Sequence, residues 1–266
     1  MGEPIKANGT EIWTERRGQG PDILLIAGLG DPAEAWQTQL DGLSERYLLT
    51  AFDNRGAGRT PLPEGGHLSA TAMADDAAAL LRALEVPSAH VAGFSMGGAI
   101  AQELALRHPG LVRSLVLVGT YARPDALWRS QLNFWRWLVE VAPSERAFLE
   151  GFFTWVYTPR AHADGTVAQI IEEALAFPHK QSVEAFQAQV DVCIEHDTED
   201  RLPQIAAPTL VLSGELDTIL PPRFGRSVAA GIPNARFEVM PGEAHQPFQE
   251  VPEEFNARVD EFWREV

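Results

Sequence analysis

Residues 91–107, with the sequence VAGFSMGGAIAQELALR, decide the fold. The apolar run Val91 to Phe94 is typical of a buried strand, and Met96 to Arg107 has the pattern of a helix that ends at His108-Pro109-Gly110. The segment Gly93-Phe94-Ser95-Met96-Gly97 joins the two. A serine on so sharp a turn needs glycine two positions before and after it, because larger side chains would collide with neighbouring backbone. The stretch therefore predicts that Ser95 presents a nucleophilic hydroxyl.

Elsewhere, short apolar runs alternate with helical patterns, which indicates a mainly parallel sheet with helices on both faces. Asn8-Gly9 lies between two extended runs and predicts a hairpin, so we expect the sheet to start antiparallel. The other expected strands are 23–26, 48–52, 115–118, 209–213 and 236–240, and further helices are expected at 73–84 and 253–263.

Between residues 121 and 202 the pattern becomes helical throughout, with no convincing buried strand. We therefore predict an α/β core formed by residues 1–120 and 203–266, interrupted by a helical cap at 121–202. The cap is rich in large apolar groups that are candidates for lining a substrate pocket, and the alternative is that most of them pack the cap onto the core. The candidates are Trp128, Phe134, Trp135, Phe153 and Trp155.

The chain of 266 residues has a formal net charge of −16, with 37 Asp and Glu against 21 Lys and Arg. Such a surface repels phosphate backbones and anionic lipid, so we expect no nucleic-acid partner and no membrane partner. Residues 1–6 contain no apolar signal-peptide core, and Cys193 is the single cysteine. We expect a cytoplasmic protein with a small-molecule substrate.

A base for Ser95 should follow a strand at the carboxyl edge of the sheet. His245 meets this condition, because it follows the expected strand 236–240 across a four-residue loop. The remaining histidines lie at helix ends, at the start of a strand, on a polar loop or in the cap; they are His67, His90, His108, His162, His179 and His196.

Asp217 follows the expected strand 209–213 and completes the chain order Ser, Asp, His that this type of fold imposes. Its predicted role is to hold the tautomer of His245 and to stabilise the imidazolium. Glu215 and Asp125 are the rival carboxylates, and Asp125 also follows a strand.

Acyl transfer also requires two N–H donors for the tetrahedral oxyanion. We expect one from the backbone of Met96, directly after the serine. The other is expected from Leu29, in the Gly28-Leu29-Gly30 loop that ends the strand 23–26.

These segments resemble the α/β-hydrolase superfamily over nearly the whole chain outside the cap. The resemblance rests on the serine turn, on residues 53–59 (DNRGAGR), on Gly214-Glu215-Leu216-Asp217 and on Gly242-Glu243-Ala244-His245. It is strongest to 3-oxoadipate enol-lactonases and related esterases. It implies a mostly parallel eight-stranded sheet, a helical cap over the site, and no cofactor or metal. One departure is Ala27-Gly28, where many members have His-Gly.

The leading hypothesis is hydrolysis of an ester or lactone through an acyl-serine intermediate. Carbon–carbon hydrolysis of a diketone would use the same triad and stays open, as does a non-catalytic ligand-binding module. Four basic residues could bind the carboxylate of a lactone acid, and the alternative is that they pair with the many surface acids; they are Arg123, Arg129, Arg136 and Lys180.

Overall fold

The computed structural model describes residues 2–266, which form one eight-stranded sheet in the order β1-β2-β4-β3-β5-β6-β7-β8. The pairs β1–β2 and β2–β4 are antiparallel and every other pair is parallel, which confirms the predicted, mostly parallel architecture. The strands are β1 (Glu3–Ala7), β2 (Thr10–Gly18), β3 (Asp22–Ile26), β4 (Leu48–Phe52), β5 (Ala89–Phe94), β6 (Val112–Val118), β7 (Thr209–Gly214) and β8 (Ala235–Met240).

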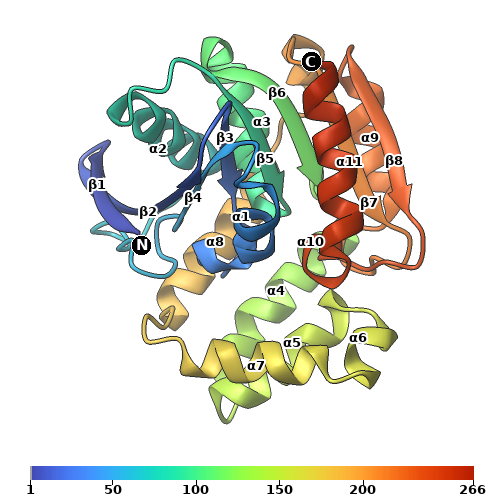
Figure 1. The fold of residues 1–266 in the computed structure, drawn as a ribbon. Coiled ribbons are helices and arrows are strands. Elements are labelled where there is room, and N and C mark those ends of the chain that lie inside the picture. The colour runs from blue at the N-terminus through green and yellow to red at the C-terminus, as the bar shows by residue number, and fades with distance from the viewer. Residues whose placement is uncertain (1) are drawn as a thin grey trace.

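The strands of the sheet centre are apolar on both faces, because helices cover both sides (Figure 1). One face packs on α2 (Ala70–Ala83), α3 (Met96–Arg107) and α9 (Pro222–Gly231). The other packs on α1 (Gln37–Leu43), α10 (Pro247–Glu250) and α11 (Pro252–Glu265). Alternation along β3 shows the division: Leu24 and Ile26 face the first layer, while Ile23 and Leu25 face the second.

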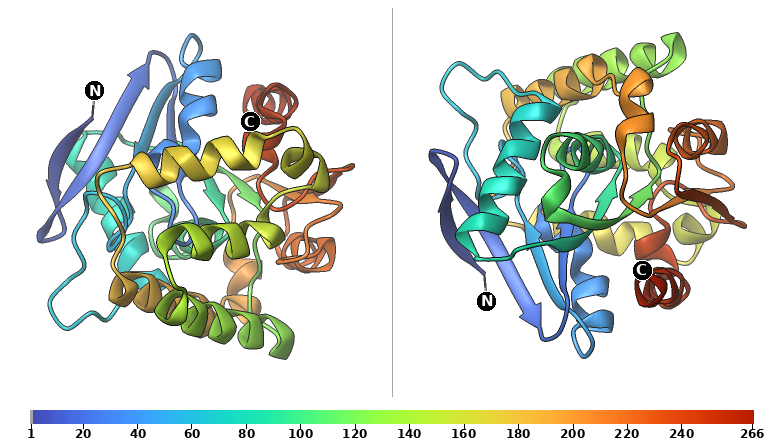
Figure 2. Two further views of the ribbon diagram at one scale, coloured as in Figure 1. Left: turned by 90° about the horizontal axis from the view of Figure 1, so that it is seen from below. Right: turned by 90° about the horizontal axis from the view of Figure 1, so that it is seen from above.

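The chain between β6 and β7 is helical, and its helices extend below the sheet in Figure 1 and across it in the left view of Figure 2. They are α4 (Ala126–Val141), α5 (Glu145–Val156), α6 (Pro159–Ala163), α7 (Thr166–Ala176) and α8 (Val183–Glu195). Side-chain oxygens accept the first free N–H groups at the start of α4, α5, α6 and α8, so most of these helices begin at a capping residue. We use the term cap for these five helices; the division of the chain into core and insertion stays a prediction.

Candidate active site

Ser95 is the single residue that connects β5 to α3, and it has a backbone conformation that few residues adopt. Its φ is 54° and its ψ is −116°, and its N–H donates to the carbonyl of Val118 on the neighbouring strand at 2.9 Å. This strain persists only because the strand and the helix on either side hold the turn. The turn leaves the hydroxyl at the carboxyl end of β5, at the N-terminus of α3.

The two flanking glycines are required by space. A Cβ at Gly93 would stand 2.3 Å from the carbonyl oxygen of Gly97, and a Cβ at Gly97 would stand 2.2 Å from that of Ile26. No real Cβ contact is this short, so any side chain would push α3 away from the sheet. The glycine spacing thus fixes the close approach of helix and strand at Ser95.

His245 lies in the loop between β8 and α10, with its ring against Ser95. Its Nε2 is 3.2 Å from Ser95 Oγ, although 150 positions separate the two residues. The ring packs on Phe94 with centroids 4.7 Å apart, and the backbone N–H of His245 donates to the carbonyl of Val156 at 3.0 Å. The ring is therefore held from the sheet side, and its backbone is tied to the end of cap helix α5.

Asp217 reaches His245 from the loop after β7. Its Oδ2 lies 2.7 Å from His245 Nδ1, and its Oδ1 accepts the N–H groups of Ile219 and Leu220 at 2.9 and 2.8 Å. Both carboxylate oxygens are thus occupied, and the side chain is fully buried.

The rival carboxylates lie elsewhere. Asp125 accepts the N–H of Trp128 at the start of α4 and pairs with Arg223 at 2.6 Å, while Glu215 accepts the N–H of Gly242 at 2.9 Å. Of the three acidic candidates, Asp217 is the one that the structure brings to the imidazole.

The two expected oxyanion donors lie on the segments from which they were predicted. Met96 is the first residue of α3, and Leu29 lies in the loop after β3. Within residues 2–266, the Leu29 N–H donates no hydrogen bond, whereas the next N–H, that of Gly30, donates to Oε1 of Gln189 at 2.9 Å. Leu29 therefore has a free donor on a loop that α8 holds in position.

A cavity of about 930 Å³ opens between the Leu29 loop and the cap. Its apolar lining comes from the Leu29 loop and from α5, α7, α8 and their connections. The large apolar residues are Leu29, Phe148, Leu149, Phe152, Phe153, Tyr157, Ile170, Phe177 and Phe186.

Of the five aromatic residues that we expected in a pocket, the structure brings Phe153 to the cavity wall. Trp128 and Trp135 are 2% exposed and pack edge to face on each other on the buried face of α4, with centroids 5.1 Å apart. Phe134 and Trp155 contact each other outside the cavity, and Phe134 is 42% exposed. Composition alone could not tell which of these aromatic residues line the cavity, because each amphipathic cap helix has residues that face the core, the cavity and water.

The four basic residues are occupied by partners. Arg123 pairs with Glu199, Arg136 pairs with Asp191, and Arg129 donates to a carbonyl of α8. Lys180, the one of the four that lines the cavity, pairs with Glu145 at 2.9 Å and donates to two carbonyls at the end of α7. None of the four is a free receptor for a substrate carboxylate.

Comparison with known proteins identifies the family to which the chain belongs. Residues 21–148 match the family model described as alpha/beta hydrolase fold. The chain is also 32% identical to "Putative carbamate hydrolase RutD" of Azorhizobium caulinodans, over 96% of each protein. The chain belongs to the alpha/beta hydrolase family.

Solved structures agree with this assignment. A thermophilic esterase from Thermogutta terrifontis superimposes with a TM-score of 0.87 at 27% identity, covering 100% of this chain and 98% of the other. The enol-lactonase from Burkholderia xenovorans LB400 superimposes with a TM-score of 0.88 at 25% identity, covering 98% and 100%. The relatives of this alpha/beta hydrolase therefore include esterases and a lactonase, as the sequence resemblance implied.

Two residues of this alpha/beta hydrolase's site were not foreseen from the sequence. Gln189 supports the Leu29 loop, as described above. Asp31, two residues after Leu29, lines the cavity, and burial raises the pKa of its carboxyl to about 7, opposed in part by the nearby imidazole of His245. No motif marks either residue, because each acts through contacts with distant segments.

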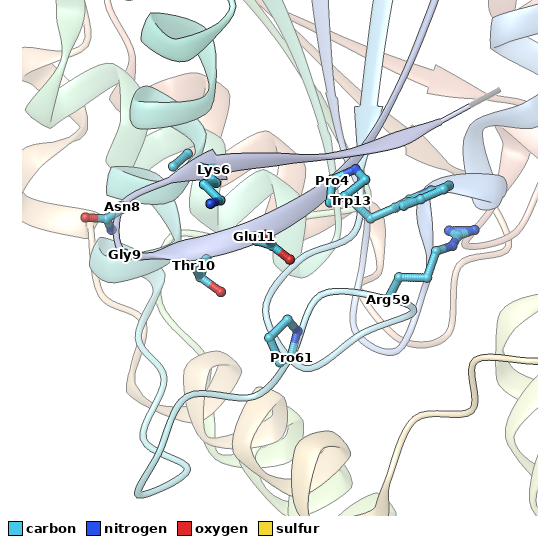
Figure 3. Close-up of a pocket in the computed structure, with 10 residues that line it drawn as sticks. Pro4, Lys6, Asn8, Gly9, Thr10, Glu11, Trp13, Arg59 and Pro61 are labelled. Atoms are coloured by element: carbon cyan, nitrogen blue, oxygen red, sulfur yellow. The ribbon is translucent and has the colours of Figure 1, made fainter.

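The second hollow of the alpha/beta hydrolase, about 720 Å³, lies along the β1–β2 hairpin (Figure 3). Arg59 closes one end, with its guanidinium 4.5 Å from the ring centre of Trp13. No part of the Leu29 loop lines it, whereas the candidate triad residues Ser95, Asp217 and His245 line neither this pocket nor the larger cavity. Within residues 2–266, no group of three or more His, Cys, Asp or Glu side chains is placed to hold a metal ion, and no helix could cross a membrane.

Proposed function

We propose that this protein is a serine hydrolase that cleaves a carboxylic ester or lactone of a small apolar or aromatic substrate. The observation that carries the proposal is the chain of contacts from Ser95 Oγ to His245 Nε2 at 3.2 Å, and from His245 Nδ1 to Asp217 at 2.7 Å. A hydroxyl, an imidazole and a buried carboxylate in this order can activate an oxygen nucleophile.

In the first half-reaction, Ser95 Oγ attacks the carbonyl carbon and its proton passes to His245 Nε2. The carbonyl oxygen becomes an oxyanion that the N–H groups of Met96 and Leu29 stabilise. The imidazolium is stabilised by Asp217, and it returns the proton to the leaving alkoxide as the carbon–oxygen bond breaks. An acyl-serine and an alcohol result.

In the second half-reaction, a water molecule gives one proton to His245 and its oxygen attacks the acyl carbon. The second tetrahedral intermediate collapses, Ser95 takes back its proton, and the acid leaves. The apolar cavity between the Leu29 loop and the cap supports binding of an apolar substrate group.

A substrate panel tests this function. Purified protein is assayed on aryl and alkyl esters, lactones, carbamates and a ring-cleavage diketone, with Ser95→Ala as the control. We expect turnover of esters or lactones, and a fall in kcat of about 10⁴- to 10⁶-fold in the variant. Turnover of the diketone alone would replace the ester proposal with carbon–carbon hydrolysis. A protein that binds panel members and turns none over would be a ligand-binding module.

A further inference from the structure

The carboxyl of Asp31 lies folded back toward the triad. A Cβ placed on Gly28 would stand 2.9 Å from both Asp31 Oδ2 and the ring of Phe94, so the carboxyl and the ring border the same small space. Phe94 in turn packs on the imidazole of His245. The side-chain amide of Gln246, the residue after His245, donates to Asp31 Oδ2 at 3.4 Å. Asp31 thus lies beside the reacting groups and also lines the cavity.

No permanent cation neutralises this carboxyl. Across residues 2–266, Asp31 takes part in no ion pair with Lys or Arg. The titratable groups that interact electrostatically with it are His245 and Tyr157, the residue after α5. Two further carboxylates lie in this region: Glu250 on α10 acts on Tyr157, and Glu34 lines the same cavity as Asp31. Glu250 is occupied by Thr158, and Glu34 pairs with Arg59, so neither offers Asp31 a positive charge.

We propose that Asp31 sets the charge preference of the site, so that the protein accepts neutral and cationic esters and rejects esters that have a carboxylate near the scissile bond. For a substrate group bound beside Leu29, the nearest charged side chain that is not already paired is the carboxyl of Asp31. A second carboxylate there would face a like charge in a space with little water, which is costly. An ammonium or a hydroxyl would find an acceptor. This inference rests on the proposed hydrolase function and names its substrate class.

The preference should depend on pH. Since burial raises the pKa of Asp31 to about 7, the carboxyl is mostly neutral at pH 6 and mostly charged at pH 8.5. Rejection of an anionic ester should therefore strengthen over this range. Taking the ratio of two esters at the same pH removes any pH effect that acts on both esters alike.

The test uses two matched ester series. Charge on the acyl side is varied with methyl pentanoate, monomethyl glutarate and methyl 4-(trimethylammonio)butanoate. Charge on the alcohol side is varied with 3,3-dimethylbutyl acetate, 2-carboxyethyl acetate and acetylcholine. Products are quantified for the wild-type protein, for Asp31→Asn and for Asp200→Asn at pH 6, 7 and 8.5. Asp200 is an exposed residue outside the cavity, so its variant controls for the change in net charge.

For the wild-type protein at pH 8.5, we expect kcat/KM for the anionic ester to lie at least about 10-fold below that for its neutral partner in one or both series, mainly through KM. Asp31→Asn should bring the two values within about threefold and remove the pH dependence of their ratio, while Asp200→Asn should keep the wild-type ratio. A structural role for Asp31 would lower all rates together and leave the ratios unchanged.

Two failures are distinguishable. If neutral esters are hydrolysed and their anionic partners are hydrolysed equally well at pH 8.5, or if Asp31→Asn keeps the wild-type ratio, the role of Asp31 is overturned and the hydrolase function stands. If no ester of any charge is hydrolysed and Ser95 reacts with no fluorophosphonate, the hydrolase function itself fails, and the role of Asp31 fails with it.

Discussion

The side-chain oxygen of Gln189, on cap helix α8, accepts a hydrogen bond from the backbone N–H of Gly30 at 2.9 Å. Gln189 is fully buried, and its amide nitrogen donates to the carbonyl of Arg55 at 2.9 Å. One side chain of the cap therefore fixes two loops of the core. Since Gly30 follows Leu29, the cap and the expected oxyanion donor are mechanically connected.

Gln189→Leu should impair both stability and catalysis. The change leaves the partly buried N–H of Gly30 and carbonyl of Arg55 without this partner, which costs up to roughly 1–3 kcal/mol for each group. A small displacement of the Leu29 donor should lower kcat/KM by about 10-fold or more. Steady-state kinetics on the best ester and urea unfolding measure the two effects.

Gln187→Leu is the matched control, since Gln187 lies on the same helix, outside the cavity, and donates to the carbonyl of Arg136. We expect its kcat/KM to stay within about threefold of the wild-type value. Wild-type kinetics for Gln189→Leu would show that the cap does not position the loop.

Asp217→Asn should lower kcat by about 10⁴-fold with little change in the structure, because an amide cannot hold the required tautomer of His245 or stabilise its cation. Glu215→Gln is a suitable control, because that carboxylate lies two residues away and bonds to Gly242. We expect Glu215→Gln to keep kcat within about threefold. Equal losses in both variants would remove the special role of Asp217.

Gly97→Ala should destabilise the protein by about 3 kcal/mol or more, because the new methyl group would overlap the carbonyl oxygens of Ile26 and Ala27. Gly110→Ala is the matched substitution, since a Cβ there meets nothing within 4 Å. We expect a change below about 0.5 kcal/mol for Gly110→Ala. Similar unfolding midpoints for the two variants would contradict the proposed close packing of α3 on β3.

Acid should weaken the fold partly through His90. Burial, aided by the charge of Arg113, lowers the pKa of this imidazole to about 4, and its Nδ1 lies 2.8 Å from Ser114 Oγ. Between pH 6.5 and 4 the unfolded chain binds a proton that the folded protein does not, so the free energy of unfolding falls as pH falls. At pH 5 this loss is about 2 kcal/mol relative to pH 8.

His90→Asn removes this titration, so its free energy of unfolding should fall less steeply from pH 8 to pH 5 than that of the wild-type protein. His67 is exposed, so His67→Asn should leave the pH dependence of the free energy of unfolding unchanged. Denaturant unfolding at several pH values provides the measurement, and parallel curves for the wild-type protein and His90→Asn would refute the assignment.

Much of the fold could be predicted because local patterns and tertiary packing agree. The apolar run before Ser95 becomes β5, and the helix after it begins and ends where predicted, at Met96 and Arg107. The candidate triad could be assembled from chain order alone, because each residue follows a strand and parallel strands end at one edge. The helices α1, α9 and α10 were not predicted. The first and last of these are short, and α9 begins at the consecutive prolines Pro221 and Pro222, which mark a turn.

The substrate side could not be predicted in the same way. Whether Phe153 or Trp135 meets the cavity depends on how α4 and α5 rotate against α8, and their spacing in the sequence does not fix that rotation. The proposed role of Asp31 rests on the positions of Phe94 and Gln246, which belong to other segments. Contacts between distant segments leave no local signal in one sequence.

The central claim is that Ser95 is the nucleophile, and covalent labelling tests it most directly. The wild-type protein and Ser95→Ala are treated with a fluorophosphonate, digested and mapped by peptide mass. The proposed mechanism predicts one phosphonate adduct, on the peptide that contains Ser95, with activity lost in proportion to labelling and no adduct in the variant. Hydrolysis that persists in Ser95→Ala, or complete inactivation by an adduct on another residue, would contradict it.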